Sequence, residues 1–242
     1  MGLLIKVVFF DLDETLYDYG SVRKTANQRV AELVEKLGII SSDVFIRTLR
    51  RITKEFYEKY QGLPALFDRK NRFREVFKAL NIDVSEEIVT RLADEYWNFV
   101  YQRIKPYPDV VPVLEFLKKK GYRLGIISDG LIDVQLNRIR ALKLEKYFDI
   151  FTFSEEVGKN KPALEIFQLA LRKANCSPSE AVMVGDNVKT DIVGANRIGM
   201  ISIWIRRGIF KNVEPDSQLE APNYTIYTLN ELIDILNNIT TI

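Results

Sequence analysis

The stretch "VVFFDLDETLYD" at residues 7–18 runs four apolar residues directly into two aspartates spaced one residue apart, Asp11 and Asp13. A short apolar run rich in β-branched and aromatic residues predicts a buried strand, here over residues 5–10. Residues two apart on an extended chain point the same way, so Asp11 and Asp13 can face one site. Two such carboxylates repel each other unless a cation or a proton separates them. The stretch therefore predicts a strand that ends at a charged site.

Short apolar runs like the first one recur along the chain. They predict further buried strands over residues 122–127, 148–153, 181–184, 201–205 and 224–227. Amphipathic helical patterns lie between the later runs, because residues such as Leu164, Phe167 and Leu171 recur at the period of a helix. Alternating strands and helices predict an α/β fold built on a parallel sheet.

Residues 17–105 interrupt this alternation. They contain four amphipathic helical segments, with no convincing strand between them, over residues 21–38, 42–60, 64–80 and 85–104. We therefore expect an all-helical cap at residues 17–105, inserted after the first strand of a core formed by residues 1–16 and 106–242. On the far side of the insert, Pro106 and Pro108 stiffen the chain, and Asp109 is expected to cap the next helix.

The composition fits a globular protein that does not bind polyanions. Of 242 residues, 47% are apolar, which is enough for a packed core. Lys and Arg number 35 against 33 Asp and Glu, so the charge indicates neither nucleic acid nor an anionic membrane as a partner. Cys176 is the single cysteine, and Lys6 and Asp11 interrupt the N-terminal apolar stretch before a secretory core could form. A cytoplasmic location is the expectation.

The sequence contains no histidine. Ser-His-Asp triads, Cys-His pairs and the common zinc sites are therefore excluded. Neither a P-loop nor a G-x-G-x-x-G fingerprint occurs, so a glycine loop that cradles a nucleotide has no support. Acid–base and nucleophilic chemistry must fall to carboxylates, lysines, hydroxyls or tyrosines.

Polar residues follow the ends of the predicted strands, where the loops of a parallel sheet open a crevice. Along the chain these residues are Asp11, Asp13, Ser128, Lys161, Asp186 and Asp191. An oxygen-only set of acids without Cys or His selects a hard ion, Mg²⁺ before Zn²⁺. Each residue alone has a simpler use: an aspartate in a turn, Ser128 as a helix cap, Lys161 at the surface. The convergence of four strand ends favours a site.

Four motifs at these positions resemble those of the haloacid dehalogenase-like (HAD) hydrolases. They are "DLDETL" (11–16), "IISDG" (126–130), "KNKPALEIF" (159–167) and "VGDNVKTDIVGA" (184–195), in the order that the family has them. The helical insert falls where that family carries a C1-type cap. The resemblance implies a Rossmann-like, doubly wound parallel sheet and a Mg²⁺-dependent phosphatase. Its substrate would be a phosphate monoester of a small metabolite, hydrolysed through an aspartyl-phosphate.

The resemblance also implies a role for each motif residue. Asp11 would attack phosphorus, and Asp13 would serve as general acid and then as general base. The metal ligands would be the carboxylates of Asp11 and Asp186 and the backbone carbonyl of Asp13, with Asp191 supporting the metal or its waters. Ser128 and Lys161 would hold the phosphoryl oxygens. Two departures stand out: Asp129 replaces the Asn frequent in relatives, and Lys159 competes with Lys161, although the following proline favours Lys161.

Several alternatives stay open at this point. A dehalogenase of the same fold would attack carbon without a metal, but its relatives lack an acid at the position of Asp13. A phosphomutase would share every site residue, and a non-catalytic binding protein would be expected to have lost at least one. The chain could be a monomer or a homodimer. Tyr17 and Asp18 could contact substrate, and Arg206 and Arg207 could face either the crevice or solvent.

Overall fold

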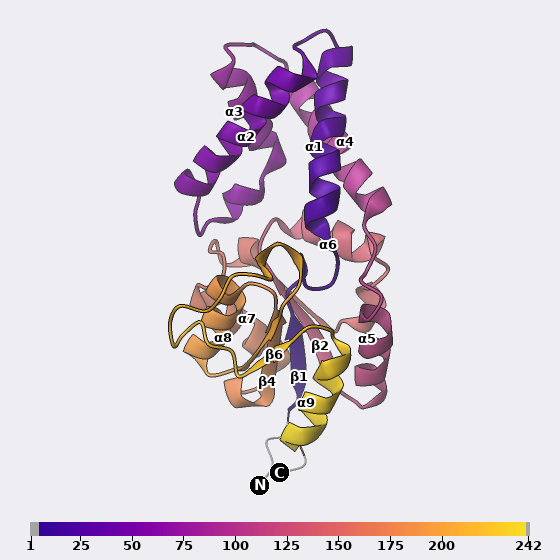
Figure 1. Cartoon of the computed structure of the whole chain (residues 1–242), viewed down its shortest axis with the longest axis vertical. Coiled ribbons are helices and arrows are strands. Elements are labelled where there is room, and N and C mark those ends of the chain that lie inside the picture. Colours follow the sequence, from indigo (N-terminus) through magenta and orange to yellow (C-terminus); the bar gives the residue numbers. More distant parts are fainter. Residues whose placement is uncertain (1–4, 241–242) are drawn as a thin grey trace.

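The computed structural model describes residues 5–240 and shows a parallel sheet that runs through the lower half of the molecule (Figure 1). Within that range, six strands form one sheet in the order β3-β2-β1-β4-β5-β6. The strands are β1 (Val7–Phe10), β2 (Arg123–Ser128), β3 (Ile150–Phe153), β4 (Ala181–Gly185), β5 (Ile201–Ile205) and β6 (Tyr224–Ile226). The predicted strands and the Rossmann-like α/β sheet are thus confirmed. The strand order reverses direction at β1, and crevices form at such points.

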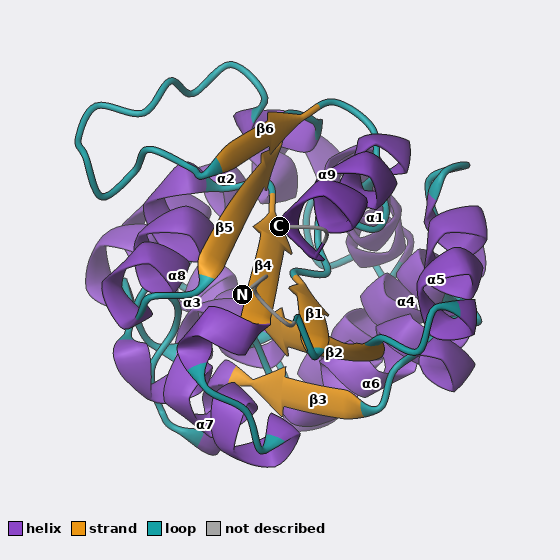
Figure 2. Cartoon of the chain, turned by 90° about the horizontal axis from the view of Figure 1, so that it is seen from below, coloured by secondary structure: helices purple, strands orange, loops and turns teal. Residues whose placement is uncertain are grey.

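Helices cover both faces of the sheet (Figure 2). Val8 and Phe10 of β1 belong to the apolar cluster on the face of α5 (Val110–Lys119), α6 (Ile132–Ala141) and α9 (Asn230–Thr240). Val7 and Phe9 belong to the cluster on the face of α7 (Leu164–Ala174) and α8 (Val193–Ile198). Because both faces are buried, every residue of β1 is apolar and the strand does not alternate.

Four α-helices lie between β1 and α5 and form a separate layer above the sheet (Figure 1). They are α1 (Tyr19–Lys36), α2 (Ser42–Lys59), α3 (Arg69–Ala79) and α4 (Glu86–Arg103), and we call them the helical cap. Aromatic residues hold this layer together: the Phe45 ring lies 6.0 Å from that of Phe73 and 5.7 Å from that of Phe77. The chain enters and leaves the cap side by side, because the Tyr107 N–H donates to the Leu16 carbonyl at 3.0 Å.

Two expectations about helix ends differ from the structure, one in full and one in part. The segment at residues 64–80 is divided into a 3₁₀ turn, η1 (Pro64–Phe67), and α3, because Asp68 caps α3 by accepting from the Asn71 N–H at 3.1 Å. Asp109 is the N-cap residue of α5, as expected, but its side chain makes no capping hydrogen bond. Its carboxylate instead accepts from Arg207 Nη1 at 3.0 Å and from the Leu229 N–H at 2.7 Å.

Short helical turns complete the described chain. They are η2 (Glu145–Tyr147), η3 (Ser154–Glu156), η4 (Pro178–Glu180), the π-helical η5 (Val188–Ile192) and η6 (Gly208–Phe210). Among residues 5–240, no helix combines the length and the apolarity needed to cross a membrane.

Candidate active site

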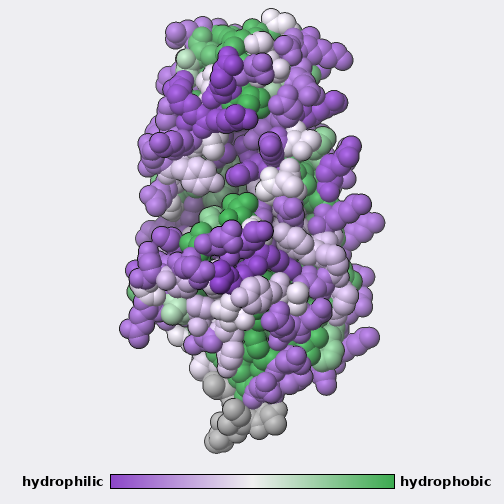
Figure 3. All heavy atoms as spheres, viewed as in Figure 1, coloured by the Kyte–Doolittle hydropathy of each residue, from purple (hydrophilic) through white to green (hydrophobic). Residues whose placement is uncertain are grey.

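A cavity of about 490 Å³ is lined by loops at the carboxyl ends of the strands and by helical-cap residues such as Tyr19 and Tyr57. In the space-filling view, hydrophilic side chains gather across the middle of the molecule, where the cap meets the core (Figure 3). The structure brings all of the polar residues predicted from the strand ends to this cavity: Asp11, Asp13, Ser128, Lys161, Asp186 and Asp191. Their catalytic roles stay predictions.

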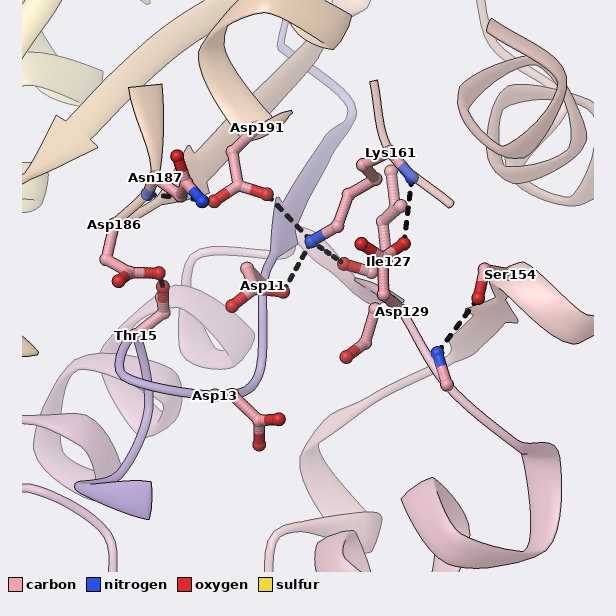
Figure 4. Close-up of polar contacts among 12 residues, drawn as sticks. Asp11, Asp13, Thr15, Ile127, Asp129, Ser154, Lys161, Asp186, Asn187 and Asp191 are labelled. Carbon is pink, nitrogen blue, oxygen red and sulfur yellow. Dashed lines mark hydrogen bonds and ion pairs between the residues drawn. The ribbon is translucent and has the colours of Figure 1, made fainter. Parts of the chain in front are cut away.

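Lys161 lies at the centre of the site (Figure 4) and is only 5% exposed. Its ammonium group donates to Asp11 Oδ1 at 2.5 Å, to Asp191 Oδ1 at 2.7 Å and to the Ile127 carbonyl at 3.1 Å. Burial alone would lower the pKa of Lys161, but Asp11 and Asp191 raise it well above its ordinary value. Lys159, by contrast, is exposed and paired with Glu165. Lys161 is therefore the fixed cation of the cavity.

Three buried carboxylates lie close to this buried ammonium group. One oxygen each from Asp11, Asp186 and Asp191 lie within 4.8 Å of one another. Burial raises the pKa of Asp11 to about 8, although Lys161 opposes the shift. Burial and the charges of Asp11 and Asp191 raise the pKa of Asp186 well above its usual range. One ammonium cannot balance three carboxylates, so the cluster favours a further proton or a metal cation.

Asp186 supplies a more specific sign that a cation fits this cluster. Its Oδ1 accepts from Thr15 Oγ1 at 3.3 Å, whereas its buried Oδ2 has no hydrogen-bond partner among the described residues. A buried carboxylate oxygen without a partner is costly in a folded protein. The donor set is oxygen only, which is the chemistry that Mg²⁺ prefers. The residues present therefore fit a divalent cation.

Gly185, the last residue of β4, allows Asp191 to reach the cluster. A Cβ at this position would lie 2.3 Å from Asp191 Oδ2, far inside van der Waals contact. The same carboxylate is held by the Asn187 N–H, which donates to Oδ2 at 3.1 Å. With Oδ2 fixed, Oδ1 points to Lys161. A glycine before Asp186 is therefore a packing requirement of the site.

The Asp13 carboxylate points away from Asp11 and Lys161 (Figure 4). It accepts from Arg138 Nη1 at 2.8 and 2.7 Å and from the Tyr17 hydroxyl. Arg138 lies on α6 and is 3% exposed. Arg138 is not among the site residues predicted from the sequence. Nothing marks a mid-helix arginine in that sequence as the partner of a residue 125 positions away.

Ser128 is buried, and its hydroxyl oxygen accepts from Gln135 Nε2 at 2.7 Å. That leaves the hydroxyl hydrogen to be donated elsewhere, and the cavity is the polar space beside it. Ser128 is not the cap of α6. The side chain of Glu155 accepts from the Ile132 N–H at 2.7 Å at the start of that helix.

The remaining candidates from the sequence stand outside the cavity. Asp18 caps α1 by accepting from the Ser21 N–H at 2.9 Å. Arg207 is paired with Asp109, and Arg206 with Glu214. Neither these residues nor Tyr17 lines the cavity, so the possible substrate contacts of Tyr17 and Asp18 gain no support.

Asp129 yields a prediction about stability. It accepts from the Lys161 N–H at 2.8 Å, and burial raises its pKa to about 6 from an unfolded value near 3.8. The folded state therefore binds more protons between these values, and stability falls as the pH rises through this range. Asp129→Asn keeps an acceptor oxygen and removes the charge. We expect it to raise the free energy of unfolding at pH 7.5 by about 1–2 kcal/mol, and to change it little near pH 4.

Urea unfolding at both pH values measures this effect. Asp149→Asn is the control of opposite sign, because the hydrogen bonds and charge of Lys118 and other groups outweigh burial and lower the pKa of Asp149. That variant should lose stability at pH 7.5. An Asp129→Asn effect that is the same at both pH values would contradict the assignment.

Comparisons with known proteins place the chain in a family. A family model described as haloacid dehalogenase-like hydrolase matches residues 5–199. The chain is 31% identical to the glyceraldehyde 3-phosphate phosphatase of Methanopyrus kandleri, over 98% of this chain and 99% of that protein. The chain belongs to the haloacid dehalogenase-like hydrolases, as the four motifs predicted.

Solved structures with similar folds include members of the same family. A HAD phosphatase from Thermococcus onnurineus matches with a TM-score of 0.71 and 30% identity, covering 96% of this chain and 98% of that one. A 2-haloacid dehalogenase from Pseudomonas syringae pv. Tomato DC3000 matches with a TM-score of 0.72 and 29% identity, covering 97% of this chain and 99% of that one. The fold is thus shared by phosphatases and dehalogenases, and the choice between them depends on the site.

Proposed function

We propose that the chain is a Mg²⁺-dependent phosphatase that hydrolyses a phosphate monoester of a small metabolite through an aspartyl-phosphate on Asp11. The observation that carries the proposal is the cluster of Asp11, Asp186 and Asp191 beside the buried Lys161, with Asp186 Oδ2 unpartnered among residues 5–240. Attack on an uncharged carbon does not call for a cation. Attack by a carboxylate on a phosphate dianion does, because the two repel. The cluster therefore favours phosphoryl transfer over dehalogenation.

The Mg²⁺ would be held by the carboxylates of Asp11 and Asp186 and by the backbone carbonyl of Asp13. Asp191 would support the metal or its waters without binding the metal itself. When bound, the ion would lower the pKa of Asp11 and screen its charge from the incoming phosphate. A carboxylate that is ionised in this way needs no base to become a nucleophile.

The side chains of the cavity would supply the nucleophile, the acid and base, and the groups that bind the phosphoryl oxygens. An oxygen of Asp11 forms a bond to phosphorus as the bond from phosphorus to the ester oxygen breaks. Asp13 donates a proton to the leaving oxygen, and then takes a proton from the water that hydrolyses the aspartyl-phosphate. The Ser128 hydroxyl and the Lys161 ammonium group bind the non-bridging oxygens, where negative charge develops in the transition state.

The cavity supports a small substrate. Its volume of about 490 Å³ leaves room for a phosphate and a short organic group, and cap residues such as Arg23, Tyr57 and Gln61 form the wall facing the catalytic loops. A cap that covers the site also excludes water during transfer. The name of the Methanopyrus relative makes glyceraldehyde 3-phosphate the first substrate to test.

Metal dependence tests the proposal. With Mg²⁺, the purified protein should release nitrophenol from p-nitrophenyl phosphate and phosphate from at least one ester in a panel of phosphorylated metabolites. Removal of divalent cations with EDTA should lower kcat at least about 100-fold, because the metal stabilises the transition state by several kcal/mol. Added Mg²⁺ should restore it. Activity that is insensitive to EDTA, or turnover of chloroacetate without metal, would reject the phosphatase in favour of the dehalogenase.

A further inference from the structure

Arg138 connects two of the proposed site residues although it does not itself line the cavity. Its Nη1 donates to both carboxylate oxygens of Asp13, at 2.8 and 2.7 Å, and to Gln135 Oε1 at 2.9 Å. The Nε2 of Gln135 in turn donates to Ser128 Oγ at 2.7 Å and to the Asp129 carbonyl at 2.6 Å. Because an amide accepts only at its oxygen, fixing Oε1 also fixes the hydrogen given to Ser128. One guanidinium thus sets both Asp13 and Ser128.

Two aromatic rings of the helical cap contact the same guanidinium group. The Cζ of Arg138 lies 4.3 Å from the ring centroid of Tyr19 and 4.7 Å from that of Trp97. Tyr19 begins α1 and Trp97 lies on α4, whereas Arg138 belongs to α6 of the core. A desolvated guanidinium gains substantially from such contacts. The cap therefore helps to determine where Arg138 lies.

The cap residues at this junction are themselves held in place. The hydroxyl groups of Tyr19 and Tyr96 lie 2.7 Å apart, and Arg69 Nη2 donates to them at 3.2 and 2.7 Å. Arg69 is 6% exposed, so this network is fixed by burial as well as by hydrogen bonds. The ring of Tyr19 that contacts Arg138 is thus part of a rigid wall.

The partner of Arg138 distinguishes this ion pair from one that only stabilises the fold. Among residues 5–240, Asp13 is the acid with which Arg138 forms an ion pair. The side chain of Asp13 is 25% exposed and lines the cavity, so it is within reach of a bound molecule. The ion pair of Arg138 therefore includes a side chain that a bound molecule can reach, which an ion pair that only stabilises the fold does not require.

We propose that Arg138 is a positioning residue: held by Tyr19 and Trp97 of the cap, it fixes the Asp13 carboxylate at the cavity wall, on the side away from Asp11, and through Gln135 it fixes Ser128. The inference rests on the proposed function, in which Asp13 protonates the leaving oxygen. It adds that the helical cap acts on the acid directly, besides covering the site. A displacement of the cap from the core would carry the rings of Tyr19 and Trp97 with it, and Asp13 would lose its fixed position.

Two esters with different leaving groups test the inference. The alkoxide that leaves glyceraldehyde 3-phosphate needs a proton, whereas the nitrophenolate that leaves p-nitrophenyl phosphate does not. For Arg138→Met we expect kcat/KM to fall about 100-fold with the alkyl ester, but only about fivefold with the aryl ester, which is affected through Ser128 and not through the acid. If another alkyl phosphate of the panel is hydrolysed faster, it replaces glyceraldehyde 3-phosphate.

Further variants separate a loss of positioning by Arg138 from a general disturbance of the structure. Arg138→Lys should recover part of the activity, because it keeps a charge near Asp13. Trp97→Leu changes neither Arg138 nor Asp13 but removes one of the two rings that hold Arg138. It should lower kcat/KM for the alkyl ester about tenfold, and it tests the inference if Arg138→Met does not fold. Arg140→Met is the matched control, because Arg140 lies on the same helix, is exposed and pairs with Glu145. It should change neither ester.

The possible outcomes distinguish a failure of the positioning role of Arg138 from a failure of the proposed function. If Arg138→Met lowers kcat/KM equally with both esters, or with neither, the positioning role of Arg138 is overturned. The proposed function is then unaffected, because the wild-type protein is active. Wild-type protein that hydrolyses neither ester overturns the proposed function itself. A selective loss with the alkyl ester in both Arg138→Met and Trp97→Leu supports the inference.

Discussion

Replacing Asp11 with asparagine should abolish the hydrolysis of p-nitrophenyl phosphate, with a loss of at least about 10⁴-fold in kcat. The amide is not nucleophilic, and no histidine exists in the sequence to activate a substitute. The loss should be visible in a second measurement. Wild-type protein quenched in acid during turnover of a ³²P-labelled ester should carry acid-stable, base-labile label, and Asp11→Asn should carry none.

Asp18→Asn is the matched control for this variant. It makes the same chemical change, and Asn caps a helix as well as Asp does, so α1 should be unaffected. Full activity and full labelling are expected. If Asp11→Asn retained label, phosphate would be transferred to another residue and the assignment of the nucleophile would be wrong.

Lys161→Met should cause the second large effect, on activity and stability together. It removes a donor for the phosphoryl oxygens, which should lower kcat about 10²- to 10³-fold. It also leaves Asp11 and Asp191 without their shared cation. Breaking a buried ion pair in this way should lower the free energy of unfolding by about 3 kcal/mol in metal-free protein. Urea unfolding with and without Mg²⁺ measures the second effect, and added Mg²⁺ should offset part of it.

Lys159→Met controls for the loss of one positive charge in the same loop. Lys159 is exposed and pairs with Glu165 at the surface, where an ion pair contributes little. Activity and stability should stay close to wild type. If Lys159→Met were the more damaging variant, the lysine of the site would have been misassigned.

The fold was predictable because its information is local. The central strands β1 and β4 are buried on both faces, so each appears in the sequence as an uninterrupted apolar run, as in Val7 to Phe10. The edge strand β6 is mostly exposed and its run is the weaker signal. The helical cap was likewise predictable from amphipathic periodicity. The break at Asp68 was missed because a helix cap within a continuous amphipathic pattern looks like any other polar position.

The cavity residues were predictable because parallel strands bring their carboxyl ends to one edge, whatever their separation in sequence. The contacts of Asp13 with Arg138, and of Asp109 with Arg207, were not. They depend on how α6 packs beneath the cap and how the loop after β5 folds back. A buried arginine on a helix looks like a solvent-facing one until its neighbours are known.

The hydrogen bond between the Tyr107 N–H and the Leu16 carbonyl has a consequence for how such a chain can change during evolution. Because the two connections to the helices touch each other, the ends that a replacement segment must join are already adjacent. A shorter, longer or unrelated segment would therefore add little loop-closure entropy and would not disturb the sheet. Substrate preference can thus diversify by exchanging or resizing this module, while the phosphoryl-transfer chemistry of the strands is inherited unchanged.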